Sequence, residues 1–259
     1  MLVKRLIAYF RRHDWSAVAV EMLVVVVGIL LAFQIDRWWE QRGERMQEVE
    51  YIARLTNDIE SDIPIIERAI ELAKLRKGMA DMLMRVAEAP ATAYEHPILF
   101  IVAVHQAAFT YSPNLTNHTF DDLRATGNLR LLREPEIKKA LFGYYDFDQD
   151  QNQYRPLQFL TESRHFELAA GILSYDQARL VQDTWYVVVP GELDNFDDSH
   201  LKPDEVRATV QRFVERDALI DWLPEMRHLQ NEQLLVNEDR LARARSVLVL
   251  LRDYSEDLN

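Results

Sequence analysis

The chain has 259 residues, enough for one large domain or two small ones with a buried core. It contains no cysteine, which excludes disulfides, thiolate metal sites and a cysteine nucleophile. Its net charge of −12 argues against a nucleic-acid partner, because proteins that bind nucleic acids present a basic surface to the phosphates. Only 7 Gly and 9 Pro favour long helices over a fold of many strands, so we predict an all-α protein.

The first predicted element is a helix that spans a membrane. Residues 17–35 form the sequence AVAVEMLVVVVGILLAFQI, in which Glu21 and Gln34 are the strongly polar residues. A helix of about 20 apolar residues crosses the hydrocarbon layer of about 30 Å. A cleaved signal peptide would have a shorter apolar region and would end in small residues. The run is therefore interpreted as an uncleaved signal anchor.

Tryptophans stand on both sides of this run. Trp15 precedes it, and Trp38 and Trp39 follow it, as amphipathic rings do at the two membrane boundaries. The segment before the run is basic, whereas charges after it balance, so the positive-inside rule places the N-terminus in the cytoplasm. We predict a cytoplasmic tail over 1–15, a transmembrane helix over 16–39, and everything beyond it outside the cytoplasm.

A membrane-proximal helical segment is predicted over 40–90. From Ile59 to Ala73 the apolar residues recur at steps of 4, 3, 4 and 3, which is the heptad pattern of a helix that buries one stripe. Such a stripe can pack within the chain or against a second chain, and the small number of clean heptads favours packing within the chain. Pro64 lacks a backbone donor, so we expect a kink there, or one helix ending and another beginning.

The remaining residues, 91–259, are predicted to form a helical external domain. Pro97 begins a buried helix that runs to about residue 111, and Thr119 caps another that stops at Gly127. Pro135 occupies the first position of the next helix. Helices resume near Pro203 after the only strand-like run, WYVVV at 185–189, and the last helix is predicted from 223 or 224 to 254.

Three segments, EMLVVVVGILLAFQIDRWWEQR, EYIARLTNDIESDI and FDDLRATGNLRLLREPEIKKALFGYY, occur in this order. Together they resemble a family of uncharacterised bacterial single-pass inner-membrane proteins. The matching residues are Glu21, Gln34, Ile35, Asp36, Trp38, Glu40, Leu123, Thr126, Gly127, Tyr144 and Tyr145. Arg37 and Trp39 depart from it, because the family usually has Asn at both positions, and Thr126 stands where the family usually has Ser. The resemblance implies an anchor in the bacterial inner membrane and a helical periplasmic domain, and it implies no activity.

Glu21 is unusual because a carboxylate inside a bilayer costs roughly 2.5–3.5 kcal/mol on insertion scales. On a helix, Ala17, Glu21, Gly28 and Ala32 form one stripe, and the small residues let two backbones approach closely. We predict a transmembrane helix–helix interface in which Glu21 forms a hydrogen bond with a partner helix. Two alternatives stay open, namely that Glu21 reaches toward water, or that a ring of such carboxylates lines an ion path.

No catalytic, metal-binding or cofactor motif is recognisable, so we predict none of these sites. Residues 146–152 have the oxygen spacing that opens a calcium loop, but Gln151 replaces the required glycine and Leu157 replaces the required acid. His105 lies in an apolar helix and is interpreted as a core histidine.

The prediction from sequence is a membrane-anchored structural or interaction protein without catalysis. It self-associates, or docks a membrane protein, through its transmembrane and proximal helices, and the lipid bilayer is its other partner. The alternatives are an accessory subunit of a membrane complex, a periplasmic ligand-binding module and, less favoured, an enzyme. The residues proposed for a weak ligand pocket are Tyr111, Tyr144, Trp185 and Tyr186.

Overall fold

The computed structural model describes residues 15–184 and 201–258, without the side chains of 15–19 and 182–184. Helices account for the regular structure of these residues, and no strand occurs among them. The all-α prediction is therefore confirmed. The strand-like run at 185–189 lies outside the described residues.

The chain divides into two units, Met1–Tyr51 and Ile52–Asn259. Helix α2 (Trp15–Glu88) contributes residues to both, and it is the described element of the first unit. Over the described residues, no helix has the combination of length and apolar character that a membrane crossing requires.

Helix α2 continues through Pro64. Proline removes the hydrogen bond from residue 64 to the carbonyl of Glu60, and the side chains of both residues are exposed to solvent. Water can therefore bond the freed carbonyl, which explains why the helix does not end here.

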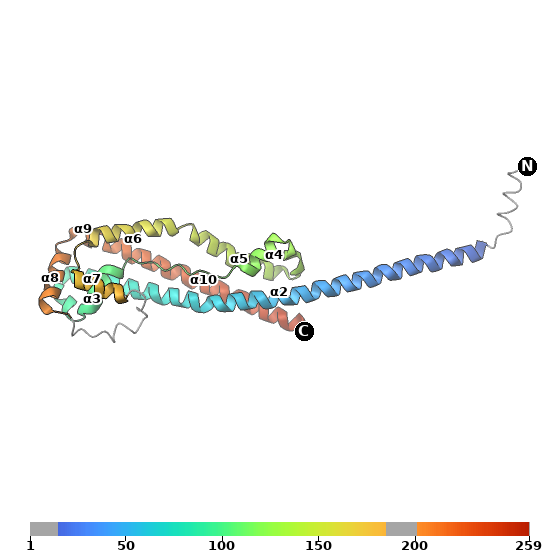
Figure 1. Cartoon of the computed structure of the whole chain (residues 1–259), viewed down its shortest axis with the longest axis horizontal. Coiled ribbons are helices and arrows are strands. Elements are labelled where there is room, and N and C mark those ends of the chain that lie inside the picture. The colour runs from blue at the N-terminus through green and yellow to red at the C-terminus, as the bar shows by residue number, and fades with distance from the viewer. Residues whose placement is uncertain (1–14, 185–200, 259) are drawn as a thin grey trace, which may run out of the picture. The chain divides into compact units, whose positions relative to one another are not determined.

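The second unit begins with the later residues of α2, and its described residues form ten further elements. They are η1 (Pro90–Tyr94), α3 (Pro97–Gln106), α4 (His118–Ala125), η2 (Asn128–Leu131), α5 (Pro135–Asn152), α6 (Arg155–Ala169), α7 (Tyr175–Thr184), α8 (Pro203–Val214), α9 (Asp217–Ile220) and α10 (Leu223–Leu258). Figure 1 shows α10 extending along α5 and along the later part of α2.

Polar pairs fix the register between α2 and α10. Moving forward along α2, the partners move backward along α10, so the two helices are antiparallel. The pairs are Glu60–Arg252, Glu67–Arg245, Lys77–Asn231 and Asp81–Arg227, at 2.5–2.8 Å. The side chains of the three ion pairs are between 34% and 59% exposed, so each of these pairs contributes little to stability.

The main apolar core lies where the end of α2 meets α3, α8 and the start of α10. Phe100 of α3 and Phe213 of α8 are fully buried there and meet edge to face, with ring centroids 5.5 Å apart. The prediction of a buried helix beginning at Pro97 is confirmed, although α3 ends at Gln106.

Other helix ends follow local chemistry. Pro135 opens α5 as predicted, and Gly127 follows α4 with a φ of 73°, a left-handed conformation that glycine adopts without strain. Helix α4 begins at His118, so the buried Thr119 lies inside the first turn and is not its cap. Helix α10 begins at Leu223 as predicted and extends four residues beyond the predicted end.

The buried stripe of α2 packs within the chain. Its fully or nearly buried positions follow steps of 3 and 4 and are Ile52, Leu55, Ile59, Asp62, Ile66, Ala69 and Ala73. This differs from the predicted stripe at two positions, where Asp62 and Ala69 replace Ile63 and Ile70. Ile63 is half-buried, whereas Ile70 is also buried, at 8% exposed.

Candidate functional site

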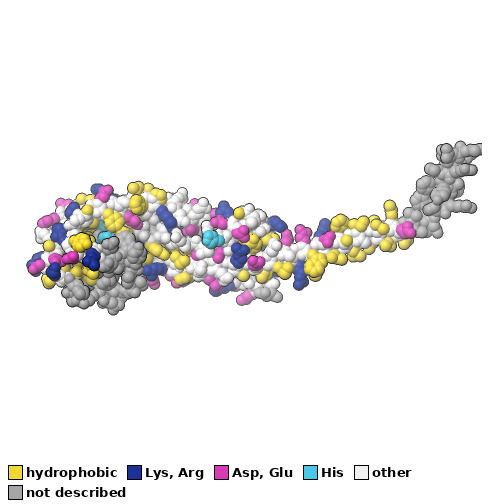
Figure 2. Space-filling model, in the orientation of Figure 1, with side chains coloured by type: hydrophobic (Ala, Val, Ile, Leu, Met, Phe, Trp, Pro, Cys, Tyr) yellow, Lys and Arg dark blue, Asp and Glu magenta, His cyan; other side chains and the backbone are white. Residues whose placement is uncertain are grey.

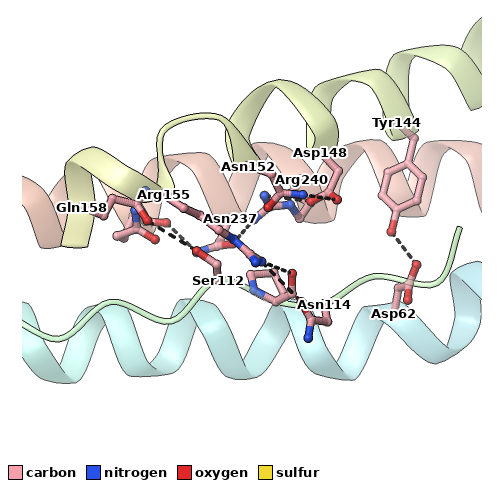
Figure 3. Close-up of polar contacts among 12 residues, drawn as sticks. Asp62, Ser112, Asn114, Tyr144, Asp148, Asn152, Arg155, Gln158, Asn237 and Arg240 are labelled. Atoms are coloured by element: carbon pink, nitrogen blue, oxygen red, sulfur yellow. Dashed lines mark hydrogen bonds and ion pairs between the residues drawn. The ribbon is translucent and has the colours of Figure 1, made fainter.

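Polar side chains fill the interior of the second unit where α2, α5 and α10 meet (Figure 3). Helix α10 has a buried stripe with steps of 3 and 4 from Leu223 to Val247, and the central positions of this stripe are polar. They are Gln230, Gln233, Asn237 and Arg240, with apolar residues before and after them. The bundle therefore has a polar layer between two apolar parts of α10's buried stripe.

Asp62 accepts hydrogen bonds from two different elements. The backbone N–H of Thr116 reaches Oδ1 at 2.9 Å, and the hydroxyl of Tyr144 reaches Oδ2 at 2.9 Å. Burial raises the pKa of Asp62, while these two hydrogen bonds act in the opposite direction. Burial, followed by the charge of Asp62, also raises the pKa of Tyr144, so its hydroxyl remains a donor.

Arg240 and Asp148 form a second pair, in which Arg240 is buried and Asp148 is 16% exposed. Nη2 of Arg240 lies 3.0 Å from Oδ1 of Asp148, and Asn152 donates to the other carboxylate oxygen at 3.1 Å. Arg240 also donates to Oδ1 of Asn237. Burial lowers the pKa of Arg240, and Asp148 opposes that effect. A pair of opposite charges with little contact with solvent favours one helix register over others.

The connection between α3 and α4 is held between the helices by side chains from both sides. Gln230 donates to the carbonyls of Ala107 and Phe109, at 3.0 and 2.7 Å. Arg155 approaches the carbonyl of Pro113 at 3.5 Å, and Thr116 is held by Asp62. The polar layer thus satisfies backbone groups of a segment that has no regular structure.

A histidine fixes α6 to α3. Nε2 of the fully buried His165 donates to the carbonyl of Val104 at 2.8 Å. Burial lowers the pKa of His165 to about 4, so the ring is neutral at pH 7. His105 lies edge to face with Phe109 and Phe166, at 5.5 and 5.6 Å, which agrees with its interpretation as a core histidine.

A cavity of about 460 Å³ lies beside the polar layer, between α4 and α5. Helix α4 contributes Phe120, Asp121 and Arg124, and α5 contributes Tyr145 and Asp148, among other residues. The rings of Phe120 and Tyr145 stack with centroids 4.4 Å apart. This volume is within the range of small-molecule sites.

The residues that the sequence predicts to form a ligand pocket differ in how deeply they are buried. Tyr144 is fully buried against Asp62, and Tyr111 is half-buried. Trp185 and Tyr186 lie outside the described residues. Tyr145, the neighbour of Tyr144, is the tyrosine that lines the cavity between α4 and α5.

The predicted membrane residues are exposed wherever their side chains are described. Glu21, Gly28 and Ala32 have exposed surfaces, and no heavy atom lies within 4 Å of the position that a Cβ would take at Gly28. Trp38 and Trp39 are exposed too, whereas the side chains of Trp15 and Ala17 are outside the described part.

In the part of the chain that the structure describes, no group of three or more His, Asp or Glu side chains is arranged to hold a metal ion. Residues 146–152 belong to helix α5, which removes the loop that a calcium site of this spacing needs.

No family model matches this chain, and comparisons with curated proteins and with solved structures find no similar protein. The resemblance to single-pass bacterial membrane proteins therefore stays a prediction.

Proposed function

We propose that this protein is a non-catalytic interaction protein, anchored in the bacterial inner membrane by its N-terminal helix. The helical unit 52–259 stands in the periplasm, and the protein self-associates or docks a membrane partner through the N-terminal part of α2. A role as an accessory subunit of a larger membrane complex is one form of the same proposal.

The observation that carries the proposal is a continuous run of exposed apolar side chains on α2. Figure 2 shows hydrophobic atoms along this helix. Each of the following side chains has an exposed fraction between 45% and 71%: Val20, Met22, Leu23, Val24, Val25, Val26, Val27, Ile29, Leu30, Leu31, Phe33 and Ile35. A helix that is apolar on all sides needs an apolar surrounding, and lipid supplies one along its whole circumference.

The limits of the span come from the sequence. Residues 17–19, whose side chains are outside the described part, complete the apolar run, and tryptophans flank it at Trp15, Trp38 and Trp39. The guanidinium of Arg42 lies 5.7 Å from the ring centroid of Trp38, a pairing suited to the headgroup region.

Self-association is supported by the stripe of Glu21, Gly28 and Ala32. The open space at Gly28 would accept the backbone of a second helix. A partner helix would also give the carboxyl group of Glu21 a hydrogen-bonding partner, which lipid does not.

Membrane anchoring is tested on the full-length chain. We expect it to stay in the membrane fraction after alkaline carbonate extraction. Because the chain has no cysteine, a Lys139→Cys variant supplies a single thiol at a side chain that is 81% exposed. A membrane-impermeant maleimide should label this thiol in intact spheroplasts. Release by carbonate, or labelling only after lysis, would contradict the proposed anchoring.

Self-association is tested by the native mass of the chain in mild detergent. Glu21→Gln combined with Gly28→Leu should reduce the assembly size, whereas Leu30→Phe, on the opposite face of the helix, should not. An unchanged mass for the double variant would reject the stripe as the interface. Co-purification of a stoichiometric second protein, lost in the double variant, would identify the docking form of the proposal.

A further inference from the structure

We propose that the cavity between α4 and α5 is a binding site for a small organic cation that carries a primary ammonium group. This inference rests on the second unit alone and does not depend on the membrane anchor. It assigns a ligand-binding role in addition to the interaction function.

The cavity is formed by matching faces of two helices. On α5, Tyr145, Asp148 and Asn152 are spaced by three and four residues, so they share one face. On α4, Asp121 and Arg124 contribute the opposite wall. The volume of about 460 Å³ exceeds that of a hydrated pocket for one ion and fits a small organic molecule.

Tyr145 lines this cavity, and its hydroxyl is a buried polar group. Tyr145 is 7% exposed, and its hydroxyl has no hydrogen-bond partner among the described residues. Buried polar groups are normally hydrogen-bonded, so a lone one calls for an explanation.

The electrostatic potential at this hydroxyl is negative. After burial, the charges of Asp58, Asp62 and Asp121 raise the pKa of Tyr145, so the group stays protonated and neutral. One carboxylate oxygen of Asp58 is likewise buried without a partner. A cation in the cavity is attracted by this potential and can donate to the lone pairs of the Tyr145 oxygen.

Asp121 is the carboxylate that is open to a ligand. It forms no ion pair or side-chain hydrogen bond with the described residues, whereas Asp148 is already bound by Arg240 and Asn152. Arg124, the cation of the cavity wall, lies over the ring of Phe120 and 3.9 Å from Asp146. The unbalanced charge of the site is therefore negative.

These features favour an ammonium group over the alternatives. An anion would face Asp121 and the field of the buried carboxylates. A divalent metal would have one unpaired carboxylate and a nearby guanidinium, which is a poor set of ligands. A primary ammonium can donate to Asp121 and Tyr145 at once, and its alkyl chain can fill the rest of the cavity.

The test uses the full-length chain in detergent, with n-butylammonium and 1,4-diaminobutane as probes. Isothermal calorimetry and thermal shift should detect both amines, whereas n-butanol, acetate and Ca²⁺ should give no signal. Asp121→Asn should weaken amine binding on the order of ten- to a hundredfold, because it removes a charge-assisted hydrogen bond. Glu136→Gln, which removes an exposed charge from α5 outside the cavity, should leave binding unchanged.

Tyr145→Phe separates a binding role from a structural one. It removes a hydroxyl that has no partner, so the free protein should melt at the same temperature or higher, while the amine-induced shift becomes smaller. Equal amine binding by Asp121→Asn and wild type would overturn the proposal, and so would binding of n-butanol, acetate or Ca²⁺ in place of the amines. Absence of any amine signal up to millimolar concentration in folded protein would reject it too.

Discussion

The hydroxyl of Tyr144 donates a hydrogen bond of 2.9 Å to Oδ2 of Asp62, and neither side chain has exposed surface. The two residues are 82 positions apart and connect α5 to α2. Because Asp62 also binds the backbone of Thr116, one buried carboxylate holds together two helices and the segment between α3 and α4.

Loss of this hydrogen bond should destabilise the second unit. Tyr144→Phe leaves a buried carboxylate with one donor fewer, and we expect the free energy of unfolding to fall by about 1–3 kcal/mol. Urea unfolding followed by circular dichroism measures the change. The neighbouring Tyr145→Phe variant, whose hydroxyl forms no hydrogen bond with the residues that the structure describes, is the matched control. Equal losses in the two variants would show that the Asp62 contact is not the cause.

Acid should weaken the packing of α6 on α3. The pKa of His165 falls from its ordinary value of 6.5 to about 4 on burial, so the neutral ring contributes stability above pH 6.5. That contribution is lost as the pH falls from 6.5 to about 4, and it amounts to on the order of 3 kcal/mol.

The measurement is the unfolding free energy of wild type minus that of His165→Gln at pH 7, 5.5 and 4.5. Glutamine keeps a donor for Val104 and does not titrate, and groups common to both proteins cancel in the difference. The difference should decrease steadily toward low pH. A constant difference would show that His165 does not carry the acid sensitivity.

Two arginines of α10 should differ greatly in importance. Arg240 is 3% exposed, and its removal leaves the largely buried carboxylate of Asp148 without its cation, so Arg240→Met should cost about 3 kcal/mol. Arg245 pairs with Glu67 on the surface, and Arg245→Met should cost less than about 1 kcal/mol. Denaturant midpoints compare the two.

The double variant Arg240→Met with Asp148→Asn provides a further check of that pair. It should be less destabilised than Arg240→Met alone, because the uncompensated charge is gone. Additive losses would argue that Arg240 stabilises the bundle by packing only.

Replacement by alanine should change the stability of the protein in opposite directions at two glycines. Gly127 has a φ of 73°, where an L side chain is strained, so Gly127→Ala should lower stability by about 1 kcal/mol. Gly143 lies in helix α5, and a Cβ there would meet an ordinary contact with Arg243 at 3.9 Å. Gly143→Ala should raise stability by about 0.5–1 kcal/mol. Thermal melts of the two variants give the sign directly.

The sequence by itself determined the helical class and several helix ends. Few glycines and prolines, with apolar residues at helical spacing, are enough to predict helices. The ends at Pro97, Pro135 and Gly127 depend on backbone geometry of one or two residues, so they could be read without knowing the fold. The continuation of α2 through Pro64 could not be predicted in this way, because it depends on whether the backbone near Pro64 is exposed to solvent in the folded protein.

Only the tertiary structure decided which polar residues are inside. In sequence, Asp62 stands beside Ile63, and the apolar residue was the natural choice for the buried stripe. Arg240 likewise looks like a surface charge in a long polar helix. Both occupy core positions because their partners, Tyr144 and Asp148, are supplied by α5 from far along the chain. The cavity beside them has the same origin, since α4 and α5 form its walls only after the helices pack. Burial of a charged side chain is stable only when a partner meets it, and that depends on packing between helices distant in sequence.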